Sequence, residues 1–75
     1  MYIVIELQTN EAGQMAYLAN VYSDRPHANQ KYHTILAAAA VSGLPMHTAI
    51  ILDASGQIMN RECYINGSRK EEIVE

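Results

Sequence analysis

The chain has 75 residues, a formal net charge of −3 at pH 7 and a single cysteine. A chain this short forms one small domain, and one cysteine excludes an internal disulfide framework. General binding to nucleic acid is not expected, because the five lysines and arginines are scattered. The sequence contains no run of about 18 apolar residues, so no membrane span is predicted. The N-terminus lacks the basic start of a signal peptide. We therefore expect a cytoplasmic protein with Cys63 reduced.

The beginning of the chain predicts a β-hairpin. Residues 2–8 alternate with period two and are rich in Ile and Val, which indicates a strand. Residues 14–22 indicate a second strand, and the segment from Asn10 to Gly13 supplies turn residues between the two. The two strands are therefore expected to pair with each other.

A single helix is predicted in the middle of the chain. Ser23 or Asp24 can cap its start, and Pro26 suits the first turn, where a missing N–H has no consequence. The helix is predicted to run to about Ser42, with Gly43 as a left-handed stop after its C-terminus.

The second half predicts another hairpin. Residues 46–52 and 57–65 read as strands, and residues 53–56 have the composition of a tight turn, with Asp first and Gly where positive φ is required. The prediction is an α+β fold of order ββαββ: a four-stranded, mainly antiparallel sheet with one helix on one face. Residues 1–66 form the single domain, and the charged tail, residues 67–75, is expected to be frayed.

One helix covers only one face of a four-stranded sheet, so the second face needs an explanation. In residues 46–52 both alternating sets of side chains are largely apolar, whereas a strand with one face in water normally alternates cleanly. Part of the second face is therefore expected to be buried against another chain. If the helix covers Ile3, Ile5 and Leu7, the opposite side of the first strand carries Tyr2, Val4, Glu6 and Gln8.

The predicted helix also has a second apolar region. At 100° per residue its core stripe consists of Ala28, Tyr32, Ile35, Leu36, Ala39 and Ser42. The opposite side is polar in its first half and small and apolar in its second half, at Ala37, Ala40 and Val41. These three residues are candidate oligomer contacts. A symmetric dimer is favoured, since it is the commonest closed assembly.

The residues that could carry chemistry show no catalytic or metal-binding pattern. His33 lies away from the core stripe, and its position relative to Glu6 or Glu62 depends on the strand order. His27 and His33 are six residues apart, which does not suit a shared metal on one helix face. Cys63 in mid-strand is typical of a small buried thiol. No metal, cofactor or enzymatic activity is expected, although an enzyme using His33 and a glutamate stays open as an alternative.

Nearly all of residues 1–65 resembles a known group of proteins. The resemblance is carried by MYIVIELQTN, by SDRPHANQKYH, by YHTILAAAAVSGLPMHTAIILDASGQIM and by the following ECY. In these segments the chain is similar to short uncharacterised proteins from phages, prophages and mobile elements of gut-associated Firmicutes. The group has no established activity, so the resemblance implies no catalytic residues.

The resemblance implies two kinds of role, by analogy with the small acidic proteins that such elements encode. The first is a non-enzymatic, self-associating interaction or accessory protein, which in one form blocks a host defence protein. The alternative is a protein that sequesters a small anionic ligand, such as a nucleotide signal, in a pocket between subunits. Candidate ligand contacts are Arg25, Lys31, Arg61 and Tyr64.

Overall fold

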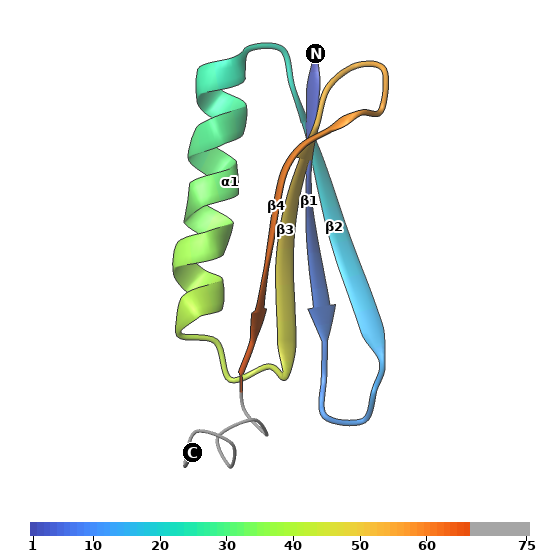
Figure 1. Cartoon of the computed structure of the whole chain (residues 1–75), viewed down its shortest axis with the longest axis vertical. Coiled ribbons are helices and arrows are strands. Elements are labelled where there is room, and N and C mark those ends of the chain that lie inside the picture. The colour runs from blue at the N-terminus through green and yellow to red at the C-terminus, as the bar shows by residue number, and fades with distance from the viewer. Residues whose placement is uncertain (67–75) are drawn as a thin grey trace.

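A computed structural model describes residues 1–66 and shows the predicted α+β fold. The elements are β1 (Tyr2–Thr9), β2 (Met15–Tyr22), α1 (Arg25–Ala40), β3 (Met46–Leu52) and β4 (Ile58–Ile65). All paired strands are antiparallel, and the sheet order is β2-β1-β3-β4. Each hairpin therefore contributes one central and one edge strand, and α1 runs alongside the strands on one side (Figure 1).

In both hairpin turns the first side chain accepts hydrogen bonds from backbone N–H groups of the turn. The Oδ1 atom of Asn10 accepts the backbone N–H groups two and four residues later, and Asp53 does the same in the second hairpin. Gly13 and Gly56 adopt φ of 84° and 89°, a region that residues with a Cβ atom avoid. The predicted turn at residues 53–56 is confirmed.

The start of α1 agrees with the prediction, but its end does not. Asp24 is the N-cap and its side chain accepts the backbone N–H of His27, at 3.4 Å. The helix ends at Ala40, and the left-handed glycines among the described residues do not include Gly43. The helix ends without a left-handed residue, because the backbone N–H groups of Val41 and Ser42 donate to carbonyl groups of its last turn. Asn66 Nδ2 adds a hydrogen bond of 2.8 Å to the Ala39 carbonyl group.

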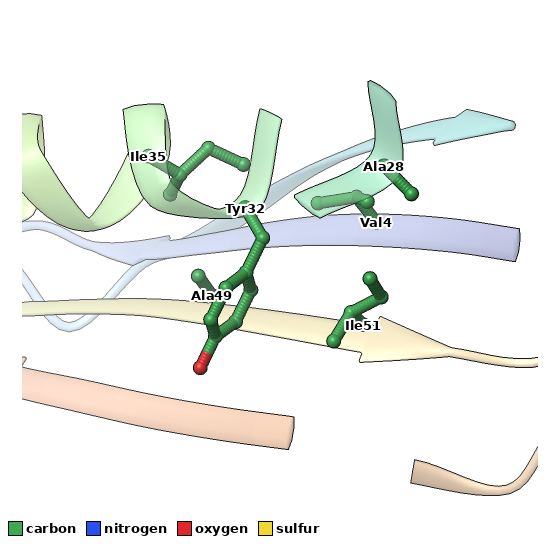
Figure 2. Packing of buried hydrophobic residues seen from close by; sticks show 6 residues of the cluster. All are labelled: Val4, Ala28, Tyr32, Ile35, Ala49 and Ile51. Carbon is green, nitrogen blue, oxygen red and sulfur yellow. The ribbon is translucent and has the colours of Figure 1, made fainter. Parts of the chain in front are cut away.

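The core lies between α1 and the two central strands. Buried side chains of α1 meet those of β1 and β3, and Figure 2 shows them: Val4, Ala28, Tyr32, Ile35, Ala49 and Ile51. The predicted stripe of α1 is confirmed for its helical members, with Leu36 partly buried, whereas Ser42 lies beyond the helix. The three alanines of α1 and β3 that are fully buried let the helix backbone approach the sheet closely.

The orientation of β1 is the reverse of the arrangement considered from the sequence. Val4 is fully buried under α1, so Tyr2, Glu6 and Gln8 share the helix-covered face, and Ile3, Ile5 and Leu7 lie on the other one. The reason is register: Val4 pairs with Ile51, and directly opposite residues of an antiparallel pair share a face. Each alternating set of side chains in β1 begins with apolar residues. The alternation alone therefore did not show which set faces α1.

Candidate functional site

The sheet has a large surface that α1 does not cover, which we call the open face. It is assigned from the strand registers and the alternation of side chains about the buried Val4, Ala49 and Ile51. The open face consists of Ile3, Ile5, Leu7 and Thr9 of β1, Met15, Tyr17, Ala19 and Val21 of β2, Met46, Thr48, Ile50 and Leu52 of β3, and Ile58, Arg61, Cys63 and Ile65 of β4.

Large apolar side chains of the open face are exposed to solvent. Six of them are between 41% and 72% exposed, namely Met15, Tyr17, Val21, Met46, Ile58 and Ile65. The aliphatic side chains of the central strands, such as Ile5 and Ile50, lie half-buried between them. Soluble monomers rarely expose so large a contiguous apolar patch, and such patches mark interaction sites.

The open face is also nearly free of charged residues. Its one charged residue is Arg61, which pairs with Ile50 across β3 and β4. The described carboxylates lie elsewhere: on the helix-covered side of the sheet or in the connecting segments, at Glu6, Glu62, Glu11, Asp24 and Asp53. A partner that packs on the open face therefore meets no carboxylate of residues 1–66.

The helix patch predicted from the sequence is exposed but small. Ala37, Ala40 and Val41 are all accessible, and Val41 is 86% exposed just beyond the end of α1. Two of the three present only a methyl group. The patch stays a candidate contact, but it offers less apolar surface than the open face.

The candidate ligand contacts do not converge on one site. Arg61 projects from the open face, whereas Tyr64, which pairs with His47, projects from the helix-covered side. Arg25 is the exposed first residue of α1, and Lys31 is half-buried on the same helix. Two of the four candidates thus lie on opposite faces of one strand. This separation does not support a pocket formed by all four.

The histidine that pairs with a carboxylate inside the fold is His47, which the sequence did not single out. Its Nε2 atom lies 2.6 Å from Oε2 of Glu6, and Gln8 Nε2 donates to the same oxygen at 3.0 Å. The side chains of His47 and Glu6 are 5% and 15% exposed. His33, by contrast, is exposed, and its ring makes an edge contact with Tyr32 at 5.3 Å between centroids.

Glu6 and His47 lie within hydrogen-bond distance, but among residues 1–66 no nucleophile lies beside them. Cys63, the strongest nucleophile available, projects from the opposite face of the sheet because it pairs with Thr48, the neighbour of His47. Within residues 1–66 no three His, Cys, Asp or Glu side chains are grouped as metal ligands. The contact gives each of these two largely buried side chains a hydrogen-bond partner.

Two buried polar side-chain atoms of the described residues have no hydrogen-bond partner: Nδ1 of His47 and the hydroxyl oxygen of Tyr32. In Figure 2 the Tyr32 ring lies beside Ala49 with its hydroxyl directed towards β4. Burial raises the pKa of Tyr32, and the negative charge of Glu62 on β4 raises it further. This hydroxyl is therefore held in its neutral form.

The remaining polar features are local and exposed. His27 donates hydrogen bonds to the Asp24 carboxylate, with Nδ1 2.7 Å from Oδ2, and this contact lowers the pKa of Asp24. A shallow depression of about 330 Å³ lies between the start of β1 and the second turn, where Asp53 is one of its polar groups. The Oδ1 atom of Asp53 is already used by Ser55 and Gln57, so the depression has little free binding chemistry.

The comparisons with known proteins assign no relative. No protein-family model matches the chain, and no significant match was found among curated proteins or solved structures. No helix in the described part of the chain is long and apolar enough to cross a membrane. The functional interpretation therefore depends on the surface and the buried polar groups of this fold.

Proposed function

We propose that this chain is a non-enzymatic, self-associating interaction protein, and that its open face binds a second copy. The supporting observation is a broad apolar sheet face with exposed Met, Tyr, Val and Ile side chains. The other features of the fold do not suggest catalysis, because the buried His47 and the thiol of Cys63 lie on opposite faces.

The size of the open face suits a stable interface. Its six most exposed apolar side chains together present on the order of 700 Å², against roughly 800 Å² that each partner buries in a standard interface. The half-buried side chains between them add to that area. An interface of this composition resembles the apolar centre of a homodimer contact more than the polar rim of a transient one.

The distribution of charge favours a second copy as the occupant. The chain carries a net charge of −3, so two copies repel each other at long range. The described carboxylates are absent from the open face, and face-to-face contact therefore brings no acidic groups of residues 1–66 together. Packing two such faces gives a β-sandwich with one α1 helix on each outer side.

The substitution Ile50→Glu tests this interface with little effect expected on the monomer. Ile50 is central on the open face, and its cross-strand partner Arg61 can form an ion pair with the new carboxylate. In an interface the carboxylate and Arg61 both lose their water among apolar side chains, and a buried ion pair is usually less favourable than the apolar contact that it replaces. We expect light scattering to show at least a halving of the molar mass for Ile50→Glu at concentrations where the wild-type chain is associated.

The matched control is Ala37→Glu, which introduces the same charge on the exposed side of α1. We expect this variant to keep the wild-type molar mass. If Ala37→Glu dissociates the assembly and Ile50→Glu does not, the contact is the helix patch and the proposed face is wrong. A wild-type chain that is monomeric at high micromolar concentration would contradict self-association itself.

A further inference from the structure

The sheet has two edges, and they differ in how well they are protected against pairing with another strand. β4 carries Arg61 and Glu62, and its pairing with β3 contains a register shift next to Ile51 and Leu52. Charged side chains and irregular pairing are both features that hinder addition of a further strand. β4 is therefore a protected edge.

β2 has none of these protections. Its sequence, MAYLANVY, contains no charged residue and no proline, and its register with β1 continues without a shift from Met15 to Tyr22. All its residues up to Val21 are exposed. Leu18 is 62% exposed although it lies on the helix-covered side, because α1 packs mainly over β3 and β1. The edge is therefore long, regular and uncharged on both faces.

We propose that β2 pairs antiparallel with β2 of a second copy across a two-fold axis, so that the two four-stranded sheets become continuous. An uncharged strand suits this occupant, because a two-fold axis places the residue on it opposite its own equivalent, where a charged side chain would face a like charge. With Leu18 on the axis, Tyr17 lies opposite Ala19 of the second copy, and Met15 lies opposite Val21. In this register open-face residues meet open-face residues.

This inference rests on the proposed self-association and adds a second contact to it. A two-fold axis perpendicular to the sheet leaves the open faces of both copies on the same side. Two such pairs can then pack face to face, which gives a closed tetramer with perpendicular two-fold axes. The expected molar mass is four times the 8.3 kDa of one chain.

The edge contact is tested with Leu18→Lys. Leu18 pairs with Glu6 across β2 and β1, so the monomer gains a favourable neighbour for the new charge. On the two-fold axis the same change places two lysines opposite each other. We expect light scattering to show half the wild-type mass for Leu18→Lys, half for Ile50→Glu, and a monomer for the double variant. Asn60→Lys, on the exposed edge strand β4, is the matched control and should keep the wild-type mass.

A cross-linking experiment fixes the register. In a Cys63→Ser background, Leu18→Cys should form a disulfide-linked dimer under mild oxidation, because directly opposite residues have Cα atoms about 4.5–5.5 Å apart. Asn60→Cys in the same background should not. If Leu18→Lys keeps the wild-type mass and Leu18→Cys stays uncross-linked, the edge contact is overturned. If Ile50→Glu has a lower molar mass than wild type and Leu18→Lys does not, the open face is the sole interface.

Discussion

The two faces of the sheet show how the same apolar composition has different consequences in different surroundings. On the helix-covered face, Val4, Ala49 and Ile51 are almost completely buried, and one His–Glu pair is buried with them. On the open face, aliphatic side chains of similar size remain partly or largely exposed. Burial in the monomer stabilises the fold through the first face, and the second face keeps apolar surface that the proposed association would bury.

The comparison is most sharply tested at two consecutive isoleucines of β3. Ile51 lies under α1 and is 2% exposed, whereas Ile50 is half-buried on the open face. We expect Ile51→Ala to lower the free energy of unfolding by about 3 kcal/mol, through lost burial and a cavity. Ile50→Ala should lower it by about 1 kcal/mol or less in dilute, monomeric protein. Urea unfolding at two protein concentrations measures both values, and equal losses in dilute protein would contradict the assignment of faces.

The polar part of the helix-covered face gives the next largest effect. His47→Ala should lower the free energy of unfolding by about 2 kcal/mol, because it leaves the Glu6 carboxylate poorly solvated and without its partner. The double variant Glu6→Leu/His47→Leu should lose less free energy of unfolding than the sum of the losses in Glu6→Leu and in His47→Leu. His33→Ala is the control, and this exposed histidine should change stability by less than about 0.5 kcal/mol. Additive losses for the pair would show that the contact is not coupled.

The unpartnered hydroxyl of Tyr32 predicts a smaller effect of the opposite sign. Tyr32→Phe removes a buried polar atom that has no partner and should raise the free energy of unfolding by about 1 kcal/mol. Burial raises the pKa of Tyr32, so the hydroxyl stays protonated in the folded chain at a pH where it ionises in the unfolded chain. The free energy of unfolding is therefore unaffected by this group below the tyrosine pKa of about 10 in the unfolded chain, and it falls as pH rises from there towards the folded value. Chemical unfolding from pH 8 to 11 should therefore show a steeper alkaline loss in wild type than in Tyr32→Phe. A destabilised variant would show that the hydroxyl has a partner.

The elements were predictable from the sequence because local signals agreed at each boundary. Period-two alternation indicated the first strand, and Asp24 and Gly56 supplied the cap and turn chemistry that the structure uses. The end of α1 was not predictable from Gly43, because the backbone N–H groups of Val41 and Ser42 close the last turn, and Asn66, far along the chain, adds a hydrogen bond to it. Signals carried by neighbouring residues were thus reliable, whereas a long-range hydrogen bond was not visible.

The candidate interaction surface was predictable only in part, for a related reason. Both alternating sets of residues 46–52 are largely apolar, which indicated that the second face of the sheet is also a contact surface. Which residues form that face depends on how β1 pairs with β3. The Glu6–His47 contact depended on the same register, since it joins residues 41 positions apart. Once Val4 is placed opposite Ile51, Glu6 and His47 fall on the same face. The register between β1 and β3 is therefore the information that could not be inferred from the sequence.

The most direct measurement of the proposed association uses the single thiol, Cys63, which projects from the open face and pairs with Thr48. Its alkylation rate by a small reagent is followed over a thousandfold range of protein concentration. We predict that the rate per molecule falls as the chain associates, and that in Ile50→Glu it stays constant at the dilute value. A rate that is independent of concentration in associated wild-type protein would contradict burial of the open face.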